Sequence, residues 1–456
     1  MTEAVFTRGN TFRHVLVMTG ASAMGLIAMF GVDLVDMFFL TLLGEQELAA
    51  AVGFAGTLLF FLVAVSIGLQ IAMGALVARS IGAKRRDLAG SFCTSSLIFN
   101  TLISALISGT AWLYVGDLLS VLGATGKTLD YATSYATIIL PSMPLMVFGM
   151  SAAAGVRAVG DARRSMWATL AGSAVNALLD PLFIFTFDLG LEGAAMASVV
   201  SRVATLVVAW HALVHVHRLP QRVDVTAFIR DLKAILRLAL PAVLTNLATP
   251  VGASFVLISM SQFGDDAVAG AAIMGRITPL AFAAVFALSS AVGPIIGQNA
   301  GAGRYDRVLS TLLNAVLFGA VYVLLVWLAL WWAADYLVDF FSASDQAAEL
   351  IVFYCHWLVG AFVFNGALFI ANASFNNLHR PHWATLFNFA KTLLGTFPAV
   401  YFGAQWYGAK GVMAGEALSA IIFGSLALMS AISLVRRLEG QHTFLAQSHL
   451  AESDRA

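Results

Sequence analysis

The stretch AMGALVARSIGAKRRD, from Ala72 to Asp87, decides the fold because the chain contains a second version of it. That version, AVGPIIGQNAGAGRYD, runs from Ala291 to Asp306, about 219 residues later. Two glycines and the last aspartate coincide, namely Gly74 with Gly293, Gly82 with Gly301 and Asp87 with Asp306. Two further pairs of stretches repeat in the same order, LGEQELAAA over FGDDAVAGA and WATL at 167–170 over 383–386. Separate matches in one order indicate a duplicated structural unit.

The composition places both units in a membrane. Of the 456 residues, 60% are hydrophobic and 11% are charged, and the mean hydropathy is +0.86, far outside the range of soluble proteins. Basic and acidic residues balance at 25 each, so the net charge predicts no nucleic-acid partner. Cys93 and Cys355 both lie in apolar stretches, which predicts neither a disulfide framework nor a metal site.

Apolar stretches long enough to cross a hydrocarbon core of about 30 Å predict the membrane spans. We expect twelve helices, near 14–42, 47–79, 90–115, 129–157, 165–187, 192–216, 235–262, 266–299, 308–334, 346–377, 382–403 and 408–435. The sequence therefore predicts an all-α polytopic membrane protein with twelve transmembrane helices in two pseudo-symmetric six-helix bundles. The expected domains are an N-terminal lobe, a cytoplasmic linker, a C-terminal lobe and a cytoplasmic tail, at 1–216, 217–234, 235–437 and 438–456.

Positive charges predict the orientation of these spans. The two termini and every second loop hold 20 of the 25 basic residues, whereas the opposite loops hold only Lys127 and Lys410. The positive-inside rule then places both termini in the cytoplasm. We expect a multi-pass protein of the bacterial inner membrane.

A carboxylate interrupts an otherwise apolar stretch, VNALLDPLFIF, at 175–185. Asn176 and Asp180 are four residues apart and share one face of the expected helix. Pro181 has no N–H, so the carbonyl of Ala177, one turn earlier, loses its helical partner and is free to bind water or an ion. The motif gathers a carboxylate, an amide and a carbonyl on one side of one helix.

Two more carboxylates, Asp33 and Asp36, share a face of the first span. A carboxylate left facing lipid costs a few kcal/mol or more, so such residues should face a cavity or each other. Burial and a like charge nearby both disfavour the ionised form, so such a group can exchange a proton near physiological pH. The same oxygens would also suit sodium, which this reasoning leaves open.

The C-terminal half carries different chemistry. Thr392 stands at the position of Asn176 and Thr396 at that of Asp180, so the carboxylate site is expected in the first lobe alone. A possible substrate cavity in the second lobe is predicted from Lys391, Glu416, Asn365 and Asn372. Pairing of Lys391 with Glu416 as a buried ion pair is an equal alternative.

The ordered set VDMFFLTLLGEQELAA, GLQIAMGALVARSIGA, AVGDARRSMW, NALLDPLFIF, GAAMAS and GQNAGA resembles the multidrug and toxic compound extrusion (MATE) family, nearest to its DinF-like branch. The resemblance covers nearly the whole chain. It implies two six-helix bundles and an exporter that works by antiport on organic, often cationic or aromatic, substrates.

The resemblance also implies site residues. The essential aspartate of the helix 1 motif falls on Asp36, the helix 5 pattern falls on Asn176, Asp180 and Pro181, and a small hydroxyl residue of helix 6 falls on Ser198. The acids that the NorM-like branch carries in its second lobe have no counterpart here, which disfavours a sodium site there.

We therefore predict a proton-coupled multidrug exporter, with small organic substrates and the lipid bilayer as its partners and a monomer as its state. The alternatives are sodium coupling on the same fold and a flippase for lipid-linked precursors, which would have a more cationic cavity. We expect no cofactor beyond the coupling ion H⁺ or Na⁺, no metal and no enzymatic activity. His211, His215 and His217 are interpreted as the end of a helix rather than a metal site.

Overall fold

The computed structural model describes residues 4–43 and 46–453, and these residues fold into helices without strands. The chain divides into two compact units. The N-terminal unit comprises Met24–Val77 and Arg86–Leu247, and the C-terminal unit comprises Met1–Ala23, Ala78–Arg85 and Ala248–Ala456. The all-α membrane fold predicted from the sequence is confirmed.

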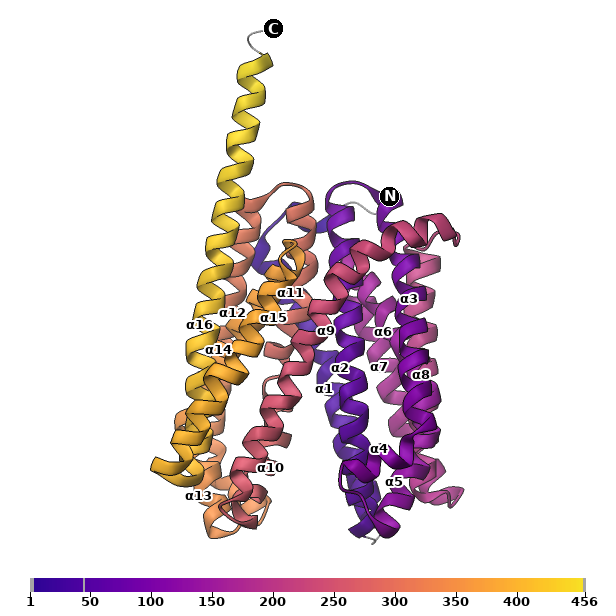
Figure 1. Ribbon diagram of the computed structural model, residues 1–456, viewed down its shortest axis with the longest axis vertical. Helices are drawn as coiled ribbons and strands as arrows, with labels where there is room; N and C mark the ends of the chain where they lie inside the picture. The colour runs from indigo at the N-terminus through magenta and orange to yellow at the C-terminus, as the bar shows by residue number, and fades with distance from the viewer. Residues whose placement is uncertain (1–3, 44–45, 454–456) are drawn as a thin grey trace. The chain divides into compact units, whose positions relative to one another are not determined.

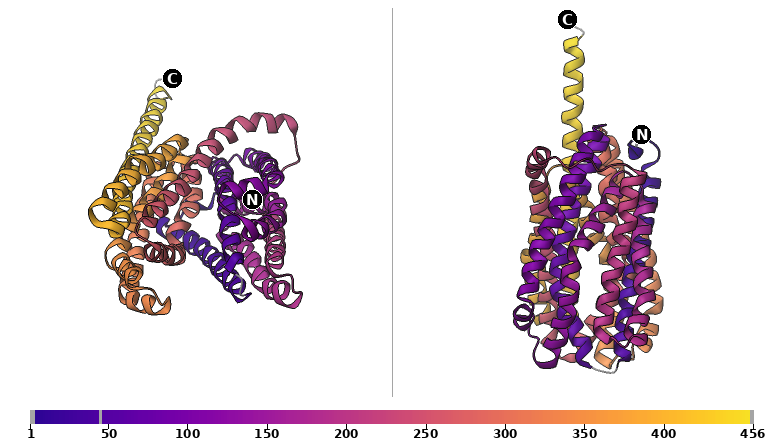
Figure 2. Two further views of the ribbon diagram at one scale, coloured as in Figure 1. Left: turned by 60° about the horizontal axis from the view of Figure 1, so that its bottom comes forward. Right: turned by 90° about the vertical axis from the view of Figure 1, so that its right-hand side faces the viewer.

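The N-terminal unit is a bundle of long helices that run side by side (right-hand view of Figure 2). Its helices lie entirely in the unit or, for three of them, extend into it. They are parts of α1 (Thr11–Leu42), α2 (Gln46–Gly82) and α9 (Val225–Ser261), and all of α3 (Arg86–Leu113), α4 (Val115–Val121), α5 (Gly126–Ile139), α6 (Met143–Ala158), α7 (Ala162–Pro181) and α8 (Gly190–His211).

The C-terminal unit contains the remaining helices, and the last of them projects beyond its neighbours α12 and α14 (Figure 1). They are α10 (Asp265–Ala281), α11 (Ala283–Gly301), α12 (Tyr305–Phe340), α13 (Asp345–Phe353), α14 (Phe362–Asn377), α15 (Pro381–Ala390) and α16 (Phe397–Ser453).

Eleven segments of the described residues are long and apolar enough to cross a membrane, and the last of these, Pro381–Thr443, contains two spans. The helix α16 breaks at Gly408, where φ is 62° and ψ is −143°. A Cβ at Gly411 would lie 1.8 Å from the carbonyl oxygen of Gly403, so the two legs of α16 meet backbone to backbone. This hairpin gives the predicted total of twelve spans.

The helix predicted at 235–262 begins ten residues earlier, at Val225. The basic segment before 235 was predicted as linker, but its Asp231 is only 1% exposed. The Asp231 carboxylate accepts hydrogen bonds from the hydroxyls of Ser91 and Ser95 on α3. Because these bonds satisfy a buried carboxylate, the first turns of α9 are held against the N-terminal unit.

At the C-terminal end, in the segment expected as the tail, α16 continues as a helix through 438–453. The boundaries of the predicted domains remain a prediction.

Close packing of α7 on α8 positions the functional residues of the N-terminal unit. A Cβ at Gly172 of α7 would lie 2.0 Å from the Thr205 hydroxyl oxygen of α8. A Cβ at Gly193 would lie 2.7 Å from the carbonyl oxygen of Phe183. At Gly193 the close neighbour is backbone, so only glycine permits this approach, and it holds α8 against the turn that follows Asp180.

Candidate cation-binding site

The end of α7 carries a buried carboxylate and amide pair. Asp180 is 0% exposed and Asn176 is 6% exposed. The Asn176 Nδ2 donates to Asp180 Oδ2 at 2.6 Å. The helical spacing of four residues predicted this contact, because residues i and i+4 lie on one face one turn apart.

The helix α1 contributes a second carboxylate. The same Asn176 Nδ2 faces Asp36 Oδ1 at 3.4 Å and Asp36 Oδ2 at 3.3 Å. The carboxyl groups of Asp36 and Asp180 also interact electrostatically. Two ionised carboxylates repel each other, so a proton or a cation bound near both of them would relieve the repulsion. The structure thus brings Asp36, Asn176 and Asp180 together.

One oxygen of this cluster is unused. Among the described residues, Asp180 Oδ1 is buried and has no hydrogen-bond partner. A buried acceptor without a partner is destabilising, so such an atom marks a place where a proton, a water molecule or an ion can be bound.

A proline and a π-helical turn surround the carboxylate. Pro181 ends α7, and the π-helical turn Leu182–Thr186 follows it. Proline lacks the N–H from which the carbonyl of Ala177 would accept in a regular helix, so Pro181 provides no i+4 partner for this oxygen. Wide π-helical turns occur frequently at functional sites.

Two further predicted residues stand apart from the cluster. Asp33 is exposed and interacts with Asp36 electrostatically. Ser198 on α8 is half-buried, and in the described chain its hydroxyl makes no hydrogen bond with Asp36, Asn176 or Asp180. The hydroxyl contact implied by family resemblance is therefore not made in this conformation.

Sequence reasoning missed Tyr135 of α5. Tyr135 interacts electrostatically with Arg202 and with the carboxyl groups of Asp36 and Asp180. The Arg202 guanidinium donates to the carbonyl of Ile139 at 3.2 Å and to the hydroxyl of Ser142 at 2.6 Å. Arg202 was visible in the sequence as an embedded charge, but nothing in the spacing of Tyr135 could have linked it to spans one and five.

The four residues predicted for a second-lobe cavity form two contacts within the C-terminal unit. Lys391 Nζ donates to Asn365 Oδ1 at 2.9 Å. Asn372 Oδ1 accepts from Asn388 Nδ2 at 2.9 Å. Glu416 is exposed and interacts with Lys391 electrostatically. In the part of the chain that the structure describes, the two do not form an ion pair, so the alternative of a buried Lys391–Glu416 pair is not supported.

The three histidines at the end of α8 make different contacts. His211 and His215 stack with ring centroids 4.9 Å apart. His217 instead contacts Asp161, with Nε2 3.0 Å from Oδ2. Asp161 also caps α7 by accepting from the backbone N–H of Arg164 at 3.0 Å. These contacts join the end of α8 to the start of α7, which is a structural role.

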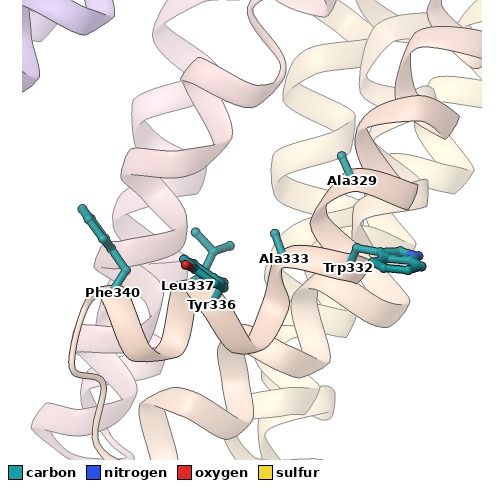
Figure 3. Close-up of a pocket in the computed structure, with 6 residues that line it drawn as sticks. All are labelled: Ala329, Trp332, Ala333, Tyr336, Leu337 and Phe340. Carbon is teal, nitrogen blue, oxygen red and sulfur yellow. The ribbon is translucent and has the colours of Figure 1, made fainter.

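A surface hollow lies on one side of α12 (Figure 3). It is lined by Ala329, Trp332, Ala333, Tyr336, Leu337 and Phe340. Trp332 is 90% exposed and Tyr336 is 81% exposed, and all six residues come from a single helix. Aromatic side chains of this kind gather where a membrane meets water, so this hollow suits contact with lipid rather than an ion site.

Comparisons with known proteins place these features in a family. The MatE family model matches residues 21–182 and 241–402, two segments that begin 220 residues apart. The chain is 27% identical over 418 residues to the FAD transporter of Shewanella oneidensis, covering 90% of this chain and 92% of that protein. It is 24% identical over 421 residues to the multidrug export protein MepA of Staphylococcus aureus, with 90% of each chain covered.

Solved structures agree with the fold. A MATE transporter from Vibrio cholerae matches with a TM-score of 0.89 and 23% identity, over 94% of this chain and 97% of that chain. A transporter of the MOP superfamily from Pyrococcus furiosus matches with a TM-score of 0.90 and 22% identity, over 96% and 99% of the two chains. The double match of the family model is what a duplicated chain produces.

Proposed function

Because this chain belongs to the MatE family of multidrug and toxic compound transporters, we propose that it is a proton-coupled exporter of organic compounds. It is a transporter and not an enzyme. The protons are carried by the cluster of Asp36, Asn176 and Asp180, which we call the carboxylate site. The placement of this chain in the DinF-like branch of the family remains a prediction.

The observation that carries the proposal is the buried and unpartnered Asp180 Oδ1 beside a second carboxyl group. In such a setting one proton changes the local charge and the hydrogen bonds at the same time. A ligand shifts a conformational equilibrium only if it binds the two conformations with different affinity. A proton has such different affinities if Asp36, Asn176 and Asp180 lie together in one conformation and apart in the other.

Sodium is the second candidate for the coupling ion. Asp36, Asp180 and the carbonyl of Ala177 supply oxygen ligands of the kind that a hard cation prefers. Protonation is favoured because Asn176 already donates to both carboxylates and occupies acceptor positions that a metal ion would need. The sodium hypothesis predicts that the Asn176 amide rotates away when the ion binds.

The proposed substrates are organic molecules that the protein moves across the bacterial inner membrane. We propose that both chain termini lie in the cytoplasm and that the protein acts as a monomer. Two of the relatives are named for the export of drugs and for the transport of FAD. FAD is an aromatic compound that carries phosphate groups, so the proposed substrates include anionic as well as cationic compounds. A flippase for lipid-linked precursors remains the alternative.

The test is transport by purified protein in proteoliposomes, with ethidium as the probe and a proton gradient or a sodium gradient applied separately. We expect transport of ethidium when the proton gradient is applied and no transport when the sodium gradient is applied. Ethidium should move in the direction opposite to the protons. Asp36→Asn should abolish this movement, while Asp33→Asn is the matched control because Asp33 lies on the same helix outside the hydrogen bonds. Transport driven only by sodium would overturn proton coupling. Full proton-driven activity of Asp36→Asn would overturn the carboxylate site.

A further inference from the structure

The C-terminal unit holds an ammonium group in its membrane-spanning part. Lys391 lies on the π-helical turn Lys391–Thr396, and its side chain is partly buried. An ammonium group has three N–H donors. Asn365 Oδ1 on α14 is the acceptor that the described residues offer it, at 2.9 Å. The amide oxygen takes one of these donors, which leaves donors of the ammonium group for a ligand.

The nearest carboxylate offsets this charge only in part. Glu416 interacts with Lys391 electrostatically, but within the described chain the two groups are not within ion-pair distance. Glu416 is also exposed, whereas Lys391 is partly buried. An embedded cation without a contacting anion is costly in a membrane and commonly marks a functional site. A negatively charged ligand at Lys391 would supply the missing partner.

Aromatic rings lie on the same side of α14 as the amide that accepts from this ammonium group. Phe362 and Phe369 share one side of α14 with Asn365, because they are three residues before it and four residues after it. Phe286 of α11 packs on both, with ring centroids 5.7 Å from Phe362 and 5.5 Å from Phe369. All three rings are partly exposed. One side of α14 thus carries both an amide that accepts from a cation and partly exposed aromatic rings within one turn of that amide.

We propose that Lys391, Asn365 and the rings of Phe286, Phe362 and Phe369 form a substrate subsite for aromatic compounds that carry a phosphate or carboxylate group. The proposal rests on the exporter function and names its substrate class. Lys391 binds the anionic group, Asn365 holds the ammonium in place, and the rings contact the aromatic part of the substrate. We call these five residues the aromatic anion subsite.

Flavin mononucleotide and riboflavin test the charge directly, because they share one ring system and differ in the phosphate. Binding is measured by flavin fluorescence with purified protein in detergent, and export is measured in proteoliposomes. We expect the wild-type protein to bind flavin mononucleotide more tightly than riboflavin. Lys391→Gln should weaken flavin mononucleotide binding about tenfold or more and riboflavin binding less than about twofold, because hydrogen bonds to charged groups are the stronger ones.

Three variants separate recognition from folding. Lys391→Arg keeps the charge and should retain the preference for the phosphate. Glu416→Gln should increase it, because it removes the opposing charge. Lys410→Gln is the matched control, because Lys410 is paired with Glu349 in another part of the same unit and its loss should leave binding unchanged.

Several results would overturn the subsite. One such result is that Lys391→Gln weakens the binding of both flavins equally. This includes the case in which Lys391→Arg shows the same loss because both variants misfold. Another is a wild-type protein that binds the two flavins equally. Ethidium export distinguishes this failure from a failure of the exporter proposal, because an active exporter with an incorrect subsite still moves ethidium. If ethidium export is also absent, the proposed function itself is wrong.

Discussion

The two units carry opposite chemistry on corresponding helices. In the N-terminal unit, Asn176 holds two carboxylates through one amide nitrogen. In the C-terminal unit, the position of Asp180 is taken by Thr396, whose hydroxyl bonds to that of Ser419 at 3.1 Å, and the nearby charge is the ammonium of Lys391. The duplication preserved the order of the helices but not the side chains between them. Ion binding and substrate binding can therefore be divided between the units.

Both units place a π-helical turn near these residues, at Leu182–Thr186 and at Lys391–Thr396. The turns do not fall at matching positions, since the first follows the carboxylate and the second begins with the lysine. An extra residue in a helical turn re-aims the side chains around it. In the N-terminal unit the π-helical turn lies near the carbonyl of Ala177, and in the C-terminal unit it carries the ammonium group of Lys391.

The largest expected effect concerns the matched positions themselves. Asp180→Asn should lower proton-driven ethidium export by about 100-fold or more, because an amide has no protonation equilibrium with which to shift the conformations. Thr396→Val should change export less than about threefold, since it removes one hydroxyl bond. Initial rates in proteoliposomes measure both. A comparable loss in Thr396→Val would show that the two units share the ion function.

Glycine packing provides an intermediate effect. In the C-terminal unit, Gly411→Ala would place a Cβ 1.8 Å from a backbone oxygen, which can only be relieved by moving the helix legs apart. In the N-terminal unit, the nearest atom to a Cβ at Gly172 is the Thr205 hydroxyl oxygen, which can rotate away. We expect losses in stability of about 3 kcal/mol and about 1 kcal/mol, respectively. Thermal unfolding in detergent measures both, and the reverse order would contradict this account of the hairpin.

The smallest effect concerns loops outside the membrane. Burial alone would raise the pKa of Asp161, but hydrogen bonds from His217 and Arg164 outweigh it and hold this pKa well below its usual value. A carboxyl group with a lowered pKa stabilises the fold above its unfolded-state pKa of about 3.9 and loses that contribution as the pH falls. Asp161→Asn should therefore cost about 1 kcal/mol at neutral pH and less in acid.

Asp306→Asn is the corresponding change in the C-terminal unit. Asp306 pairs with Arg304 at 3.1 Å, but both side chains are exposed, so no measurable loss is expected. Urea unfolding of the two variants at about pH 7 and about pH 2 makes the comparison, because only the lower value lies well below the unfolded-state pKa. A pH-independent loss in Asp161→Asn would mean that its carboxylate charge does not stabilise the junction of α7 and α8.

The sequence determined the membrane fold because its signals are local or periodic. Span lengths, the positive-inside pattern and the register of Ala72–Asp87 over Ala291–Asp306 each follow from the order of residues alone. The Asn176–Asp180 contact follows from helical spacing in the same way. The earlier start of α9 was not predictable, because it depends on Asp231 finding Ser91 and Ser95 on a distant helix.

The tertiary structure alone decided which polar groups meet. Asp36 contacts Asn176 although the two are 140 residues apart in the chain, and Ser198 lies outside their hydrogen bonds. Tyr135 interacts electrostatically with Asp36. Lys391 donates to the amide of Asn365 and not to Glu416. The physical reason is that a residue's spacing along a helix fixes the face on which it lies. Which other helix covers that face is set by packing, through close approaches such as those of Gly172 and Gly193.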